Sequence, residues 1–251
     1  MSDPFHSSKY CIARARQHVS DLKRQVVEFI KTEPYTFVME VDPSTCEEVH
    51  KLKLTKPMPV ALPGIAFDAA NNLRSSLDQA IHSVILLATG KEIRNAFFPI
   101  ARTESEFENT VKGRLKELPK EILDLIRALK PYEGGNIPLL ALNALSNTNK
   151  HAFITPVAIA SGKEMHFKGT VRGNTLINVP VWDRAKNEME LIRQPVGSAY
   201  EVDIKFTYFV AMCDVEFVDG APIDAVFKKL VGVVEGIIMA IEAEARRLGL
   251  V

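Results

Sequence analysis

The stretch that decides the fold is "IAFDAANNLRSSLDQAIHSVILLA", from Ile65 to Ala88, in which apolar residues recur every three or four positions. This spacing places their side chains on one face of an α-helix. The face consists of Ala66, Ala70, Leu73, Leu77, Ala80, Val84 and Leu87. The segment therefore predicts a long helix with one buried side, against which other helices can pack.

Two further long helices are predicted near the two ends of the chain. Apolar residues keep the same spacing over residues 7–31, which precede a proline, and again over residues 222–248. Shorter helices complete a helical part of about residues 65–150. One of them begins at Thr103, which forms a capping box with Glu106 three positions later.

β-Strands are predicted in two regions. A hairpin over residues 35–55 turns at Asp42-Pro43-Ser44, and residues 153–218 follow a period of two between apolar and polar side chains. The second region has room for about five strands, including a half-buried one from Val202 to Met212. We therefore expect a single α+β domain, residues 1–251, in which a helical bundle packs with an antiparallel β-sheet.

Composition narrows the class of protein. Hydrophobic residues make up 47% of the 251 residues, and 31 basic residues balance 31 acidic ones, so no global field attracts nucleic acid or an acidic membrane. The three cysteines are scattered without a CxxC pair, and the apolar runs are too short to cross a membrane. We expect a cytoplasmic protein with no cofactor, no metal site and no membrane association.

The candidate catalytic residues lie on the polar side of the Ile65–Ala88 helix. Arg74, Asp78 and His82 follow one another at intervals of four, so Asp78 can pair with Arg74 and orient the His82 imidazole for general-base chemistry. Asn72 joins Arg74 and Asp78 as a candidate ligand-binding residue. The alternative is structural, because an amphipathic helix often carries a weak ion pair on its exposed side.

A second polar group follows the helix that is predicted to end at Asn147. The sequence "NTNKH" supplies Asn147, Asn149, Lys150 and His151 as candidate ligand-binding residues. In the functional interpretation, Lys150 anchors an anion and His151 acts as acid, base or ligand, so His151 is also a catalytic candidate. In the structural interpretation, an asparagine ends the helix and the cations lie at its negative C-terminal end.

The order of four short motifs resembles a widespread family of uncharacterised bacterial proteins. The motifs are "NLRSSLD" (Asn72–Asp78), "FFPI" (Phe97–Ile100), "KPY" (Lys130–Tyr132) and "LSNTNKH" (Leu145–His151). The family shows N-L-R-S-x-L-D, F-P-I, P-Y and N-x-D-K-H-R in the same order, and the resemblance covers most of the chain. This chain has asparagine and alanine in place of the aspartate and arginine of the last motif. The resemblance implies no particular activity.

The first motif is also similar to the Arg-x(4–6)-His motif of HEPN-type ribonucleases, which are helical domains of bacterial defence and toxin systems. Relatives often have a histidine directly after the aspartate, where this chain has Gln79, and His82 lies too far from Arg74 to restore the spacing. Glutamine cannot exchange a proton near a scissile phosphate. The similarity therefore implies an inactive member, unless His151 takes the role.

Two functions remain open on these grounds. The leading hypothesis is a cytoplasmic bacterial protein that is non-catalytic and binds a small ligand or a partner. The alternative is a HEPN-like protein that binds or cleaves RNA through Arg74 with His151 or His82, which an excess of basic residues in the first helix (six against two) favours. The apolar stripe of the C-terminal helix is wider than a coiled-coil seam and also allows a homodimer through that helix.

Overall fold

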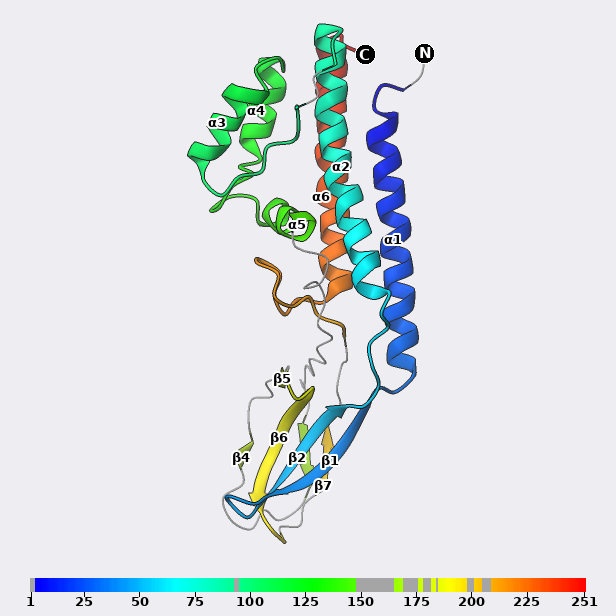
Figure 1. The fold of residues 1–251 in the computed structure, drawn as a ribbon, viewed down its shortest axis with the longest axis vertical. Helices are drawn as coiled ribbons and strands as arrows, with labels where there is room; N and C mark the ends of the chain where they lie inside the picture. Colours follow the sequence, from blue (N-terminus) through cyan, green and yellow to red (C-terminus); the bar gives the residue numbers. More distant parts are fainter. Residues whose placement is uncertain are drawn as a thin grey trace.

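Three long helices lie side by side and form the main body of the molecule (Figure 1): α1 (His6–Lys31), α2 (Leu62–Thr89) and α6 (Ile223–Arg247). The structure is a computed structural model that describes residues 3–92, 95–147, 165–168, 176–177, 182–183, 185–197, 201–204 and 209–251. Three shorter helices, α3 (Glu104–Arg114), α4 (Lys120–Ala128) and α5 (Ile137–Asn147), lie on one side of this body. The long helices confirm the sequence prediction, with ends that differ by a few residues at most.

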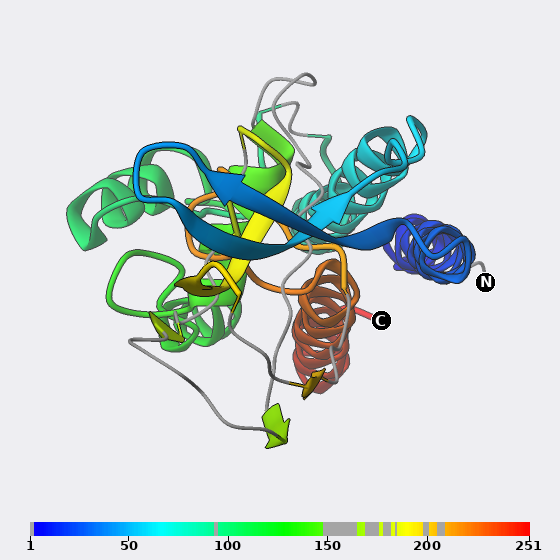
Figure 2. The same cartoon turned by 90° about the horizontal axis from the view of Figure 1, so that it is seen from below.

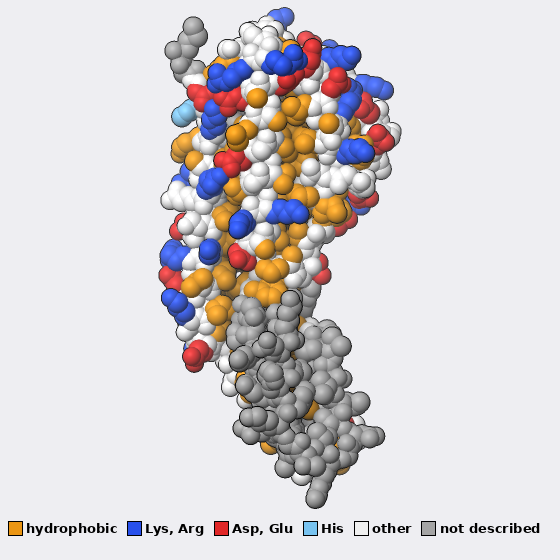
Figure 3. Space-filling view, turned by 180° about the vertical axis from the view of Figure 1, so that it is seen from behind, with side chains coloured by type: hydrophobic (Ala, Val, Ile, Leu, Met, Phe, Trp, Pro, Cys, Tyr) orange, Lys and Arg blue, Asp and Glu red, His pale blue; other side chains and the backbone are white. Residues whose placement is uncertain are grey.

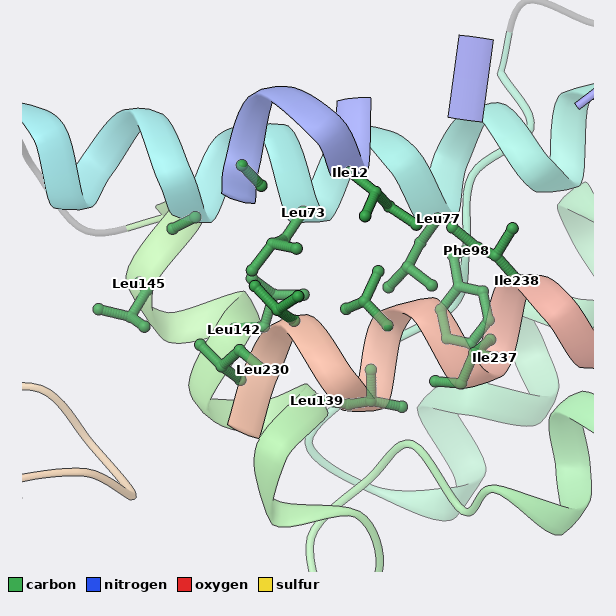
Figure 4. Packing of buried hydrophobic residues seen from close by; sticks show 14 of the residues in the cluster. Ile12, Leu73, Leu77, Phe98, Leu139, Leu142, Leu145, Leu230, Ile237 and Ile238 are labelled. Atoms are coloured by element: carbon green, nitrogen blue, oxygen red, sulfur yellow. The ribbon is translucent and has the colours of Figure 1, made fainter. Parts of the chain in front are cut away.

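The periodic face of α2 lies in the middle of the hydrophobic core. Of the residues predicted for this face, all are buried except Leu87, which is partly buried against the same core. Figure 4 shows how side chains from α2, α5 and α6 meet there together with Phe98 from the loop that follows α2. The labelled residues are Ile12, Leu73, Leu77, Phe98, Leu139, Leu142, Leu145, Leu230, Ile237 and Ile238. The removal of this apolar surface from water is the main stabilising term of the bundle.

An antiparallel sheet lies at one end of the bundle (Figures 1 and 2). Its described strands run in the order β1 (Tyr35–Asp42), β2 (Glu47–Leu54), β6 (Glu188–Pro195) and β4 (Leu176–Ile177), and β5 (Trp182–Asp183) also pairs with β6. β3 (Met165–Lys168) and β7 (Glu201–Ile204) pair with each other. The predicted hairpin is confirmed, and the chain is an α+β protein.

The sheet has a small hydrophobic cluster separate from that of the bundle. Leu52 of β2 is fully buried in it beside three residues of β6, which are Met189, Leu191 and Ile192. Tyr35 and Trp182 cover this cluster, with their rings edge to face at a centroid distance of 6.3 Å. The described segment that links β2 to α2 contacts the bundle core through Leu54, the last residue of β2, and through Met58. The sheet thus extends the bundle lengthwise.

The segment before α6 differs from the predicted half-buried strand. β7 ends at Ile204, and residues 210–213 are all buried, so apolar and polar residues do not alternate between core and solvent there. The chain folds back here: the Met212 N–H donates to the Ala221 carbonyl at 2.8 Å, and Ala211 forms an isolated bridge with Pro222. Val210 and Met212 pack in the bundle core, whereas Ala211 and Cys213 pack beside Trp182 and Phe209, so both faces of the segment are covered.

None of the helices in the described part of the chain combines the length and the apolar character that a membrane crossing requires.

Candidate functional site

Arg74 and Asp78 lie one turn apart on α2 and both bond to the backbone of Phe98. An Nη2–H of Arg74 donates to the Phe98 carbonyl at 2.7 Å, and the Phe98 N–H donates to Asp78 Oδ1 at 2.8 Å. Arg74 Nη2 and Asp78 Oδ1 are 3.4 Å apart. We call this arrangement the Phe98 clamp. It satisfies both backbone polar groups of the buried residue Phe98, which would cost free energy if they were left without partners.

Burial opposes the charge on both side chains of the clamp. Burial lowers the pKa of Arg74, an effect that the nearby Asp78 carboxylate partly offsets. Burial likewise raises the pKa of Asp78, against the influence of the Arg74 charge and of the Phe98 N–H. Nη1 of Arg74 is buried and has no hydrogen-bond partner among the described residues. The pair is therefore a partly desolvated ion pair that holds a loop to α2.

The other polar residues of this stretch do not complete a catalytic set around Asp78. No hydrogen bond or ion pair joins Asp78 to His82, although both residues are described, and His82 is half-buried farther along α2. Asn72 bonds within its own helix, because its Nδ2 donates to the Asp68 carbonyl at 2.8 Å. Gln79 is exposed. The geometry thus matches the structural interpretation of this motif.

The loop that the clamp holds continues directly into a pocket. Its next residues pair with the segment that contains the "KPY" motif: the Ala101 N–H donates to the Pro131 carbonyl at 3.0 Å, and the Glu133 N–H donates to the Arg102 carbonyl at 3.1 Å. These bonds and the Phe98 clamp fix the loop on both sides. Three motifs that lie far apart in the sequence are therefore joined in one continuous assembly.

The pocket lies between this loop, α5 and the turn formed by residues 214–217. Its volume is about 510 Å³. The residues that line it are Ile100, Ala101, Arg102, Glu106, Glu133, Leu140, Asn143, Ala144, Asn147, Asp214, Glu216 and Phe217. We call it the α5 pocket. Apolar residues supply part of the wall, and the rest consists of amide, carboxylate and guanidinium groups, a mixture typical of a site for a small polar molecule.

Arg102 organises the charged side of the α5 pocket. Its guanidinium lies 2.9 Å from Glu216 and 3.8 Å from Glu133, so it joins two segments that are far apart in the sequence. Its backbone N–H donates to Glu106 Oε2 at 3.2 Å, while the Glu106 N–H donates to Thr103 Oγ1 at 3.2 Å. The predicted cap of α3 is thus confirmed, with the return bond shifted from Thr103 to Arg102.

Two asparagine amides of α5 also line the α5 pocket. Asn143 and Asn147 are four residues apart and therefore lie on the same side of the helix, one turn from each other. Neither side-chain amide forms a hydrogen bond with the residues that the structure describes. Each amide offers both a donor and an acceptor, so the pair can recognise a ligand that presents both kinds of group.

The turn on the opposite wall holds two residues in an unusual backbone conformation. Asp214 has a φ of 58° and Phe217 a φ of 72°, values that strain any residue other than glycine. The Asp214 N–H donates to Asp219 Oδ1 at 2.9 Å, which stabilises the turn. Phe217 remains 38% exposed and contributes an aromatic surface to the pocket.

Of the predicted ligand-binding residues, Asn147 lines the α5 pocket, whereas Asn149, Lys150 and His151 lie outside the described residues. Arg74 and Asp78 support the pocket loop without lining the pocket. Sequence reasoning missed Arg102, Asn143 and the 214–217 turn. The four-residue spacing between Asn143 and Asn147 was the one available signal. The described part of the chain contains no group of three or more histidines, cysteines or acidic residues that could hold a metal ion.

Comparisons with known proteins leave the chain without an assigned family. No protein-family model matches it, and no curated protein and no solved structure shows a significant match.

Proposed function

We propose that the protein is a non-catalytic, cytoplasmic binding protein that holds a small polar ligand in the α5 pocket. The observation that carries this proposal is a pair of amides, Asn143 and Asn147, which bond to no other described side chain or backbone group and lie on one wall of a pocket of about 510 Å³. Carboxylates outnumber the arginine in the lining, four against one. A neutral or cationic ligand is therefore expected, since an anion would be repelled.

The contacts of Arg74 and Asp78 support a non-catalytic role for this pair. Asp78 accepts a backbone N–H and contacts Arg74, and it makes no bond to His82 through which it could orient a base. A general base must lie within hydrogen-bond reach of the proton it removes. The clamp instead supports the loop that forms the pocket.

Two further observations support the compartment and the family resemblance. Cys11, Cys46 and Cys213, all of them described, form no disulfide, as expected in a reducing compartment. Three of the four motifs that resemble the bacterial family meet in the Phe98 clamp and the backbone pairing of Ala101 with Pro131. A shared motif order is expected where the motifs form one structural unit.

Ligand-detected NMR with mixtures of nucleosides, sugars, amino acids and polyamines tests the proposal. Compounds that bind the α5 pocket should lose at least about tenfold in affinity on Asn143→Leu. The matched control is Asn109→Leu, an exposed position on α3 outside the pocket, which should leave affinity unchanged. Thermal unfolding checks that both variants fold. Absence of any bound compound, or equal affinity of wild type and Asn143→Leu, would contradict the proposal.

RNA binding or cleavage is the second candidate, and the excess of basic residues in α1, six against two, is the observation that favours it. Lysine and arginine side chains form charge-assisted hydrogen bonds with phosphate oxygens. Against it, three of the six basic residues of α1 are already paired with acidic groups: Lys9 with Asp3 and Glu242, Arg16 with Glu235, and Arg24 with Asp21 and Glu28. Incubation with mixed tRNA, beside a His151→Ala variant, separates the two functions. Salt-sensitive binding or cleavage that His151→Ala abolishes would favour RNA.

A further inference from the structure

A groove runs between α1 and α6 on the side of the molecule away from the α5 pocket. Its volume is about 500 Å³, and its apolar floor comes from Val19 of α1 and Val231 of α6, beside the small residues Ser20 and Gly232. The ion pair between Arg16 and Glu235 crosses from one helix to the other. Figure 3 views this side of the molecule, where hydrophobic atoms lie between charged groups.

The floor of the groove continues along α6 as a smooth, uncharged strip. Gly232, Gly236, Met239 and Ala243 are all exposed and lie within about 60° of one another at 100° per residue. Met239 exposes 65% of its surface and adds a flexible apolar side chain to the strip. The strip extends over about three turns, which is the length of a typical helix–helix contact.

The two glycines have no explanation within the chain itself. Glycine is the least favourable residue after proline in a helix interior. A Cβ added at Gly232 or Gly236 would meet no atom within 4 Å, so internal packing does not require glycine at either position. Small residues at such positions allow the backbone of another helix to approach closely.

The unpaired charges beside this strip are mostly positive. Arg16 already neutralises Glu235, and Arg246 and Arg247 are paired with acidic residues of α6 itself. Lys23, Lys228 and Lys229 are exposed and form no ion pair with the described residues, whereas Asp224 is the one acidic residue of the groove in the same situation. Three lysines against one aspartate leave an excess of two positive charges.

We propose that the α1–α6 groove binds an acidic amphipathic helix of a partner protein. The apolar face of that helix would cover Val19, Val231 and the glycine strip, and its carboxylates would lie against Lys23, Lys228 and Lys229. This is the helix-in-groove mode of recognition, in which apolar anchors provide affinity and flanking charges provide specificity. A second copy of the chain fits less well, because α6 would bring the same unpaired lysines into the contact.

Two synthetic peptides of about 18 residues test this proposal, since that length spans the strip with a turn to spare at each end. Both carry leucine at positions 1, 4, 5, 8, 11, 12 and 15, about the spacing of an apolar helical face. One has glutamate at the flanking positions and the other has lysine. Fluorescence anisotropy should show tighter binding of the glutamate peptide, and by at least about tenfold.

Variants of the protein place the binding in the groove. Gly232→Leu fills the floor and should reduce affinity for the glutamate peptide at least about tenfold, while thermal unfolding shows that the chain still folds. Gly113→Leu on α3 is the matched control, because a Cβ there also meets no atom within 4 Å. Lys228→Glu should weaken the glutamate peptide and strengthen the lysine peptide.

Three results would overturn the proposal. The first is equal binding of the two peptides, which would indicate apolar adsorption without charge recognition. The second is an affinity that Gly232→Leu leaves unchanged. The third is a concentration-dependent dimer in light scattering that Gly232→Leu dissolves, which would assign the groove to a second copy of the chain.

Discussion

The backbone N–H of Phe98 donates a 2.8 Å hydrogen bond to Asp78, twenty positions earlier in the chain. The guanidinium of Arg74, one turn away on α2, donates a hydrogen bond to the carbonyl of the same residue, Phe98. Two charged side chains therefore hold the backbone of one residue in the loop that leads into the α5 pocket. The pair belongs to the support of the pocket, and its loss should appear first in stability.

Replacing Asp78 by alanine should lower the free energy of unfolding by about 2–3 kcal/mol. The substitution leaves the Phe98 N–H without its acceptor and the buried Arg74 guanidinium without its carboxylate. Urea unfolding followed by circular dichroism measures the change. Gln79→Ala, at the exposed neighbouring position, should change the free energy by less than about 0.5 kcal/mol. A clamp without structural importance would give similar values for the two variants.

Low pH should destabilise the sheet, because it protonates the carboxylates of Glu40 and Glu188, which are paired with Lys51 and Lys53. Hydrogen bonds from Lys51 and Lys53 lower the pKa of Glu40 from 4.5 to about 2. Burial raises the pKa of Glu188, but bonds from the same two lysines outweigh burial and the net direction is downward. A carboxyl whose pKa is lowered on folding stabilises the protein above its unfolded pKa, and this stability is lost as the pH falls through the folded pKa.

The matching test is Glu188→Gln, which removes one of these charges. At pH 7 the variant should be about 1–2 kcal/mol less stable than the wild type, because Glu188 is buried between two lysines. The difference should shrink as the pH falls from about 4.5 towards 2, since the wild-type carboxyl is then protonated as well. Glu117→Gln, at an exposed glutamate, serves as control. A difference that stays constant with pH would show that charge is not the cause.

Gly135 should be intolerant of even a methyl group. A Cβ at this position would clash with the Lys130 carbonyl oxygen and would lie 2.5 Å from the Lys130 Cβ, in a loop where Lys130 itself has a φ of 47°. Gly135→Ala should therefore cost about 1–3 kcal/mol in thermal unfolding. Gly113→Ala, in a helix with open space around it, should instead stabilise by about 0.5–1 kcal/mol. Equal effects of the two substitutions would rule out the close contact as the cause.

Leu77 should be among the costliest positions of the core. It is fully buried where α2 meets α6, as Figure 4 shows, so Leu77→Ala removes apolar contacts and leaves a cavity. The expected loss is about 2–5 kcal/mol in the free energy of unfolding. Leu86, on the same helix but 40% exposed, should lose less than about 1 kcal/mol on the same substitution. Similar losses at both sites would show that the face of α2 is assigned wrongly.

Sequence periodicity was sufficient for the helices because it is a local property. The face with Leu73 and Leu77 repeats at the helical period, and no other part of the chain is needed to recognise it. The alternating pattern did not reveal that residues 210–213 are buried on both faces. Ala211 and Cys213, on the face that the pattern assigns to solvent, pack beside Trp182 and Phe209, which come from other parts of the sequence or from the chain next to them.

The candidate site could be predicted from the sequence only in part. The sequence determined that Arg74 and Asp78 share one side of α2 and that Asn143 and Asn147 share one side of α5, since both pairs are four residues apart. Only the tertiary structure decided that the first pair holds Phe98 and that the second faces Glu216 and Phe217 across a pocket. The physical reason is distance along the chain: these partners come from separate segments, and only packing of the helices around the core brings them within hydrogen-bond range or on to a common cavity.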